Sequence, residues 1–153
     1  MSDEGADKVT GPSGGEAGSR SRGQATAYVL DASALLCLIN DEPGSDRVAA
    51  VLSSSVISAV NLAEVTSKLN ELGADAETAR ALLAPLHLAV VLFDEGAGYA
   101  TGALRVATRG RGLSLGDRAC LSLAGSRGAT ALTTDTAWAD AGERVGVPVE
   151  MLR

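Results

Sequence analysis

The sequence has few of the residues on which most catalytic sites depend. It contains one histidine, His87, and two cysteines, Cys37 and Cys120. These counts exclude most zinc sites, Ser-His-Asp triads and Cys-His nucleophiles, and two cysteines do not make a disulfide framework. Both cysteines stand in apolar runs, so we expect them to be buried free thiols. Any catalysis must therefore come mainly from carboxylates, hydroxyls and arginines.

Aromatic residues and positive charge are also scarce. Aromatics make up 3% of the chain, which excludes base-stacking platforms of the RRM or OB type. The net charge is -6, so only a local basic patch could bind nucleic acid. No run reaches the roughly 20 apolar residues of a membrane span, and no apolar segment of a secretory signal opens the chain. We expect a cytoplasmic protein that does not associate with membranes.

The chain is long enough for one domain with a core, since it has 153 residues of which 46% are hydrophobic. Residues 1–26 are rich in glycine, serine and charge. Such a segment buries too little apolar surface to offset its ordering entropy, so we predict a disordered extension followed by a globular domain over residues 27–153.

Apolar strand patterns alternate with helical patterns along the globular part. This alternation predicts an α/β domain with a parallel sheet and helices on both faces. The continuous apolar run of the third predicted strand is typical of a buried parallel strand. The predicted strands are Ala27–Leu30, Ser55–Ser58, Leu88–Phe93, Ala129–Thr133 and Val147–Met151.

Four acidic residues fall where strands lead into helices. Asp31 and Asp135 directly follow strands, Glu64 lies in the second turn of the helix after the second strand, and Asp117 lies in the first turn of its helix. Ligands of open α/β sheets bind at the carboxyl ends of the strands. We therefore expect these four carboxylates to meet at one edge of the sheet.

A carboxylate cluster of this kind needs compensating positive charge. No lysine or histidine flanks any of the four acids. A hard divalent cation, Mg²⁺ or Mn²⁺, is the natural partner, and such ions activate water for phosphodiester hydrolysis. The residues alone thus predict a metal-dependent phosphoryl-transfer site, most simply a nuclease.

Each acid also has an ordinary structural interpretation. Asp31 can cap the first helix, Glu64 can be an exposed helix residue, Asp117 can complete a capping box with Ser114, and Asp135 can be a turn residue. Other acids fit only such roles: Asp94 is predicted to cap a helix, and Asp140 and Glu143 are expected to be exposed on a short helix. Trp138 is expected to be a packing anchor.

The four acids stand in four distinctive segments. These are Tyr28-Val-Leu-Asp31-Ala-Ser33-Ala-Leu-Leu, Ser58-Ala-Val-Asn61-Leu-Ala-Glu64-Val, Leu113-Ser-Leu-Gly-Asp117-Arg118-Ala-Cys-Leu-Ser-Leu-Ala and Leu132-Thr-Thr-Asp135-Thr-Ala-Trp138. With these segments the chain resembles the PIN-domain ribonucleases, and more closely the VapC-type toxins of bacterial toxin–antitoxin pairs. The Leu-Ser-Leu-Gly-Asp-Arg part of the third segment is the most specific, and the resemblance covers residues 27–153.

The resemblance implies a three-layer α/β/α domain with a parallel sheet of about five strands. It also implies Mg²⁺- or Mn²⁺-dependent endoribonuclease activity, a homodimer, and inhibition by a cognate antitoxin protein. The acidic constellation of the family corresponds here to Asp31, Glu64, Asp117 and Asp135. Positions that support the metal site by hydrogen bonds correspond to Ser33, Asn61, and Thr133 or Thr134.

One basic stretch stands out in this acidic chain. Between residues 105 and 127 there are five arginines, and Asp117 is the only acid. We interpret Arg109 and Arg111 as RNA phosphate contacts on a glycine-rich loop, although they can equally serve to keep an exposed loop soluble. Arg118 can orient the scissile phosphate or only pair with a nearby carboxylate.

Other protein classes also begin with an aspartate after a strand, and the sequence departs from each. A metal-dependent adhesion module would need a serine where Leu35 stands, and a haloacid-dehalogenase-type phosphatase an aspartate in place of Ser33. A receiver domain would need a late lysine, but Lys68 is the only lysine of the globular part. The alternative that stays open is a non-catalytic PIN-fold module that binds nucleic acid or protein.

Overall fold

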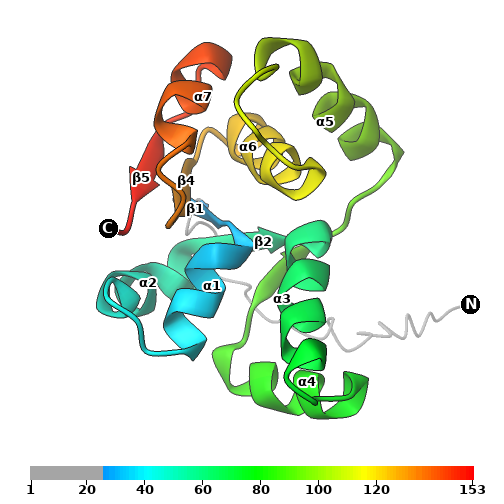
Figure 1. The fold of residues 1–153 in the computed structure, drawn as a ribbon, viewed down its shortest axis with the longest axis vertical. Coiled ribbons are helices and arrows are strands. Elements are labelled where there is room, and N and C mark those ends of the chain that lie inside the picture. Colours follow the sequence, from blue (N-terminus) through cyan, green and yellow to red (C-terminus); the bar gives the residue numbers. More distant parts are fainter. Residues whose placement is uncertain (1–25) are drawn as a thin grey trace, which may run out of the picture.

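The computed structural model describes residues 26–153, and a five-stranded parallel sheet runs through this part of the chain (Figure 1). The strand order is β3-β2-β1-β4-β5, and every neighbouring pair is parallel. The predicted disordered extension over residues 1–26 lies outside the described residues, except for Thr26. The strands are β1 (Tyr28–Leu30), β2 (Ser55–Ser58), β3 (Ala89–Val91), β4 (Thr130–Thr133) and β5 (Val149–Met151).

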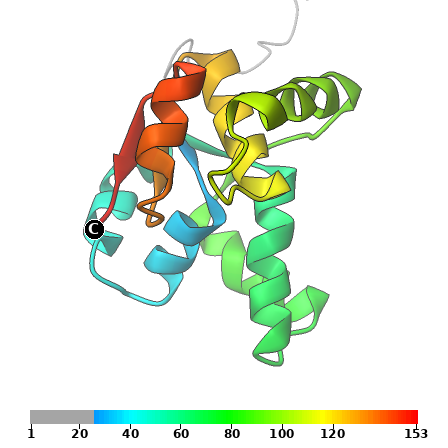
Figure 2. The ribbon, with the colours of Figure 1, turned by 45° about the horizontal axis from the view of Figure 1, so that its top comes forward.

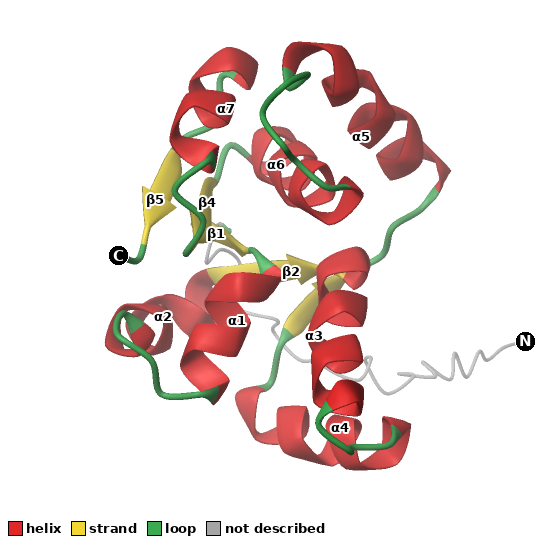
Figure 3. Cartoon of the chain, viewed as in Figure 1, coloured by secondary structure: helices red, strands yellow, loops and turns green. Residues whose placement is uncertain are grey.

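Helices cover both faces of the sheet, as Figures 2 and 3 show. Residues 26–153 form seven α-helices. One layer holds α1 (Ala32–Ile39), α2 (Ser45–Val51), α3 (Ala59–Glu71) and α4 (Ala76–Leu83). The other holds α5 (Glu95–Ala107), α6 (Leu115–Arg127) and α7 (Trp138–Val145). Short 3-10 turns, η1 (Leu52–Ser54) and η2 (Ala84–Leu86), follow α2 and α4. Within residues 26–153, no helix combines the length and the apolar character that crossing a bilayer requires.

Two hydrophobic cores lie on opposite faces of the sheet because strand side chains alternate in direction. Leu30, Ile57 and Leu132 pack with the layer of α1 to α4. Their neighbours Val29, Val56 and Ala131 pack with α6 and α7. Both cores contain residues of three central strands, which confirms the predicted three-layer α/β/α architecture.

The prediction that Leu88–Phe93 forms a buried strand is wrong. Only Ala89–Val91 forms a strand, and it pairs on one side alone, with β2. Val90 is 40% exposed and Leu92 is 79% exposed. The strand lies at the edge of the sheet, where the helices cover it incompletely. Its apolar composition therefore does not reflect burial within the described residues.

Trp138 anchors the start of α7 in the core. Its side chain is fully buried among residues of α6, β4 and β5, including Leu121 and Ala131. The indole N–H has no hydrogen-bond partner among residues 26–153. A ring enclosed in this way cannot stack on a nucleobase, so the packing interpretation of Trp138 is confirmed.

Candidate active site

The structure brings the four predicted acidic residues to the carboxyl edge of the sheet. The N-terminal parts of α1, α3 and α6 lie close together (Figure 1), and α3 contacts both α1 and α6. Asp31 is the N-cap residue of α1, Glu64 lies in the second turn of α3, and Asp117 lies in the first turn of α6. Asp135 follows β4, the strand beside β1. The electrostatic effects connect all four: Asp117 and Glu64 raise the pKa of Asp31, and Asp135 raises the pKa of Asp117.

Asp31 is the most deeply buried of these acids, with 4% of its surface exposed. It occupies the N-cap position of α1, but its side chain makes no capping hydrogen bond. Instead its Oδ2 accepts hydrogen bonds from Ser33 Oγ at 2.6 Å and from Thr133 Oγ1 at 3.0 Å. The structure thus rules out helix capping as the task of this carboxylate, and the hydrogen bonds fix its orientation.

The same two hydroxyl groups tie the β1–α1 turn to the β4–α7 turn. Ser33 Oγ accepts from the backbone N–H of Thr134, and Thr133 Oγ1 accepts from the backbone N–H of Asp135, both at 3.0 Å. Ser33 and Thr133 therefore both hold the Asp31 carboxylate by hydrogen bonds. Thr134 takes part through its backbone rather than its side chain.

Glu64 is held at the edge by a contact between α3 and α6. Asn61 Nδ2 donates to Glu64 Oε2 at 3.0 Å and to the carbonyl oxygen of Gly116 at 3.1 Å. Asn61 is fully buried, and its Oδ1 has no hydrogen-bond partner in the described part of the chain. A side chain at Gly116 would overlap the Glu64 carboxylate. The glycine is thus what allows Glu64 to lie beside Asp117.

Gly116 has a role that the sequence interpretation missed. Glycine lowers the stability of a helix relative to alanine. A glycine in the first turn of a helix, directly before an acidic residue, is therefore a usable signal that another group packs closely against that turn. Here the neighbour that approaches is a carboxylate from α3, 52 residues earlier in the chain.

Asp117 serves the start of its own helix as well as the cluster. Ser114 N donates to Asp117 Oδ2 at 2.8 Å, and Asp117 N donates to Ser114 Oγ at 3.1 Å, so the predicted capping box is present. Burial nevertheless raises the pKa of Asp117 above its ordinary value, and the charge of Asp135 adds to this effect. The carboxylate is therefore both a helix cap and a member of the acidic cluster.

Asp135 is the most exposed member of the cluster. Its Oδ1 accepts from the backbone N–H of Ala137 at 2.9 Å, so the turn interpretation of this residue is correct locally. After burial, the charge of Asp135 is a further cause of the raised pKa of Asp117.

Within residues 26–153, Arg118 offsets part of the negative charge of the cluster at Asp117, but the pKa values of the acids are still raised. Burial raises the pKa of Asp31 from 3.8 to about 6, and burial also raises the pKa of Glu64. Cys120 lies buried beneath them, where desolvation and the charges of three of the acids hold its thiol pKa well above the usual range. The Cys120 thiol therefore stays neutral and supplies no compensating charge or nucleophile.

The donor set fits a hard divalent cation because it consists of carboxylate oxygens close enough to raise one another's pKa. As the side chains stand, however, no group of three or more acidic, histidine or cysteine side chains within residues 26–153 is arranged to hold an ion. Asp117 and Asp135 each use one oxygen in a local hydrogen bond. The four residues thus offer the oxygen ligands that Mg²⁺ or Mn²⁺ prefers, but their side chains are not arranged around an ion.

The three predicted RNA-binding arginines have different surroundings. Arg109 is exposed in the loop between α5 and α6. Arg111, two residues further on, pairs with Asp140 of α7. Arg118 extends towards α5, where its Nη1 lies 3.5 Å from the carbonyl oxygen of Thr101, and its charge lowers the pKa of Asp117. Asp140 is exposed on the short helix α7, as the sequence predicts, and it also pairs with Arg111.

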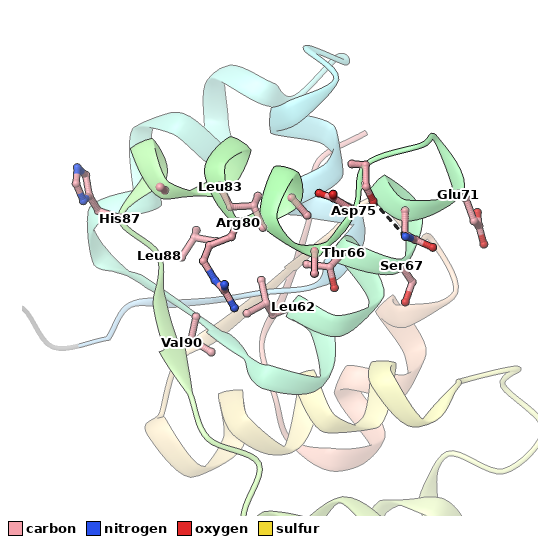
Figure 4. A pocket seen from close by; sticks show the side chains of 15 residues that line it. Leu62, Thr66, Ser67, Glu71, Asp75, Arg80, Leu83, His87, Leu88 and Val90 are labelled. Carbon is pink, nitrogen blue, oxygen red and sulfur yellow. Dashed lines mark hydrogen bonds between the residues drawn. The ribbon is translucent and has the colours of Figure 1, made fainter.

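A separate groove of about 830 Å³ lies between α3, α4 and β3 (Figure 4). Its walls are formed by apolar side chains such as Leu62, Leu83 and Leu88, with Arg80 and Glu71 at its sides. None of the predicted site residues lines this groove. The acidic site and the groove are thus distinct features of the surface.

Comparison with known families matches residues 28–144 to the PIN domain. This match spans most of the chain, and the protein belongs to the PIN domain family. No curated protein matches the chain in sequence.

Solved structures with a similar fold include VapBC complexes and FitAcB. A chain of the DNA-bound VapBC complex from Salmonella typhimurium has a TM-score of 0.65 and 20% identity, over 83% of this chain and 98% of that one. VapBC2 from Rickettsia felis, bound to a promoter DNA fragment, gives a TM-score of 0.63 and 20% identity, over 82% and 98%. FitAcB from Neisseria gonorrhoeae gives 0.61 and 20%, over 82% and 97%. At these identities the similarity establishes a shared fold.

Proposed function

We propose that this protein is a divalent-metal-dependent endoribonuclease and the toxin of a type II toxin–antitoxin pair. The observation that carries the proposal is the convergence of Asp31, Glu64 and Asp117 at one edge of the sheet, with pKa values raised by burial and by one another. Carboxylates that raise one another's pKa in this way are suited to bind a cation, whose positive charge would relieve their repulsion. The PIN fold and its similarity to VapBC structures support the same activity.

In this proposal Asp31, Glu64, Asp117 and Asp135 hold Mg²⁺ or Mn²⁺. The ion would activate a water molecule and stabilise the charge that develops on the scissile phosphate. Ser33 and Thr133 fix the Asp31 carboxylate through Oδ2, and Asn61 fixes Glu64 through Oε2. These hydrogen bonds would limit the number of orientations that the ligands sample before the ion binds.

The RNA backbone would contact the arginines beside the site. Arg109 is exposed and free to approach a phosphate, and Arg118 lies next to Asp117 in sequence and electrostatically. In a chain with a net charge of -6, these few cations would determine where RNA binds. A cognate antitoxin, a homodimeric state and a cytoplasmic location complete the proposal.

RNA cleavage by the purified protein tests the activity. We expect cleavage of single-stranded RNA in Mn²⁺ or Mg²⁺, no cleavage in excess EDTA, and no cleavage by Asp31→Asn under any of these conditions. Expression of the wild type, but not of Asp31→Asn, should arrest bacterial growth. Cleavage that persists in EDTA would overturn the metal-dependent mechanism.

A non-catalytic PIN-fold binding module is the second candidate. The observation that favours it is that no three potential metal-ligating side chains of residues 26–153 are arranged around an ion as they stand. RNA binding without cleavage at millimolar Mn²⁺, with the same affinity for wild type and Asp31→Asn, would support this alternative.

A further inference from the structure

Two arginines converge on one carboxylate of α7, outside the acidic cluster. Arg111 Nη1 forms an ion pair with Asp140 Oδ2, and Arg144 Nε lies 3.6 Å from the same oxygen. Arg111 comes from the loop between α5 and α6, whereas Asp140 and Arg144 lie one turn apart on α7 (Figure 3). The three side chains are between 34% and 50% exposed, so a ligand in solution can reach them.

The ion pair joins the two segments that carry site residues. Arg111 lies six residues before Asp117, and Asp140 lies five residues after Asp135. Both partners of the ion pair therefore belong to chain segments that lead directly to a residue of the acidic cluster. Neither arginine belongs to that cluster.

The backbone holds Arg111 in a defined place. The glycines on both sides of it, Gly110 and Gly112, have φ angles of 78° and 68°, which favour glycine strongly. The backbone N–H of Arg111 donates to the carbonyl oxygen of Thr108 at 3.2 Å, and Thr108 is buried. A tight, anchored loop thus directs Arg111 towards α7. An arginine that only kept the loop soluble would not need such a defined position.

One carboxylate between two guanidinium groups leaves an excess of positive charge at this point. Exposed ion pairs contribute little to stability, so this arrangement is poorly explained as a structural support. Two guanidinium groups directed at one oxygen are well suited to a phosphate, which carries more acceptor oxygens than a carboxylate.

We propose that Arg111 and Arg144 form a phosphate-binding site for the RNA backbone, between the segments that lead to Asp117 and from Asp135, and that Asp140 occupies this site as a competing anion. The inference rests on the proposed function for its choice of RNA as ligand. Asp140 then weakens RNA binding, because a phosphate must displace its carboxylate from the two guanidinium groups before it can bind them. Arg144 and Asp140 thereby become affinity-determining residues outside the acidic cluster.

Binding of a fluorescein-labelled single-stranded RNA in EDTA, measured by anisotropy on the full chain, tests the inference. Asp140→Asn should bind about two- to five-fold more tightly, the range that the release of an exposed ion pair allows. Glu143→Gln is the matched control, since it removes the same charge from an exposed site on the same helix and should change affinity by less than about 1.5-fold.

Further variants separate a local competition from a general charge effect. The gain from Asp140→Asn should disappear when Arg111 is also replaced, in Arg111→Gln/Asp140→Asn. Arg111→Gln and Arg144→Gln should each weaken binding and reduce the salt dependence of log K by about 0.7 per lost phosphate contact. Circular dichroism should show the same fold for all variants.

Three outcomes would overturn the inference. Equal effects of Asp140→Asn and Glu143→Gln would mean that only net charge matters. Weaker binding by Asp140→Asn would mean that Asp140 orients Arg111 instead of competing with RNA. An unchanged salt dependence in Arg144→Gln would remove Arg144 from the site. RNA binding is measured here without metal, so its result does not depend on cleavage. If the variants change RNA affinity as expected but the wild type never cleaves RNA, only the proposed nuclease activity is overturned.

Discussion

Gly116 lacks a side chain at the place where the carboxylate of Glu64 lies, and a methyl group there would overlap it. The two residues come from α6 and α3, and Asn61 connects the helices by donating to Glu64 and to the Gly116 carbonyl. The close approach of these helices therefore depends on a glycine and places Glu64 next to Asp117.

Gly116→Ala should displace the Glu64 carboxylate and lower RNA cleavage by about ten- to a hundred-fold, because small misplacements of a catalytic group are costly. Alanine favours the helical backbone at this position, so the fold should persist. Cleavage rates and circular dichroism of the purified variant check this. Gly102→Ala is the control: a side chain there meets no atom within 4 Å, and cleavage should be unchanged. Equal activity of the two variants would contradict the positioning of Glu64 by Gly116.

Each of the variants Asp31→Asn, Glu64→Gln, Asp117→Asn and Asp135→Asn should reduce the RNA cleavage rate by at least about a hundred-fold. Loss of a metal ligand removes several kcal/mol of transition-state stabilisation, and about 1.4 kcal/mol is already tenfold in rate. Single-turnover cleavage in Mn²⁺ measures the effect. Glu143→Gln should stay within a few fold of the wild type. Asp140 does not serve as a neutral control, since it pairs with Arg111.

The metal-free protein should lose stability as the pH rises from about 4 to about 6. Asp31 has a pKa of about 6 in the folded state because it is buried, whereas an unfolded aspartate titrates near 3.9. The folded state thus binds this proton more tightly, so the free energy of unfolding falls as pH rises through this window and stays lower above it. Burial shifts the pKa values of Glu64 and Asp117 in the same direction.

Asp31→Asn should remove part of this pH dependence and raise the free energy of unfolding at pH 7 by on the order of 2 kcal/mol. Thermal melts in EDTA between pH 4 and pH 7.5 provide the measurement. Parallel pH profiles of wild type and variant would show that Asp31 carries no buried charge.

Divalent metal should stabilise the wild type at neutral pH by neutralising the acidic cluster. At ten times the dissociation constant, an ion that binds only the folded state adds about 1.4 kcal/mol, or roughly 5 °C in melting temperature for a domain of this size. Melts with Mn²⁺ and with EDTA measure the shift. In Asp31→Asn the shift should shrink or vanish, and an identical shift in both proteins would place the ion elsewhere.

Removal of residues 2–25 should leave the fold and the cleavage activity intact, since their composition predicts no contribution to a core. Thr26 is kept because its hydroxyl accepts a hydrogen bond from Arg127 at 3.2 Å, and Ala27 because it bonds to Ser54 and Thr130. A melting temperature lowered by more than about 4 °C, which corresponds to roughly 1 kcal/mol, would contradict the predicted domain boundary.

Much of the candidate site followed from the sequence because its signals are local. Asp31 and Asp135 come directly after strands, and alternating strands and helices place such residues at one edge of a parallel sheet. The capping box of Ser114 and Asp117 depends on a spacing of three residues, which the sequence shows directly. Local patterns of this kind depend on neighbours within about four positions of the chain, and so the sequence predicts them well.

Only the tertiary structure could decide the contacts between distant segments. Glu64 looks like an exposed helix residue until α6 packs against α3 and brings Gly116 to it. The exposure of β3 depends on its place at the edge of the sheet, and an apolar run does not specify strand order. The Arg111–Asp140 pair likewise arises from the packing of α7 near the α5–α6 loop. The sequence by itself determined the elements, their caps and the edge at which the acids meet, whereas distances between side chains from separate helices followed from close packing of the whole domain.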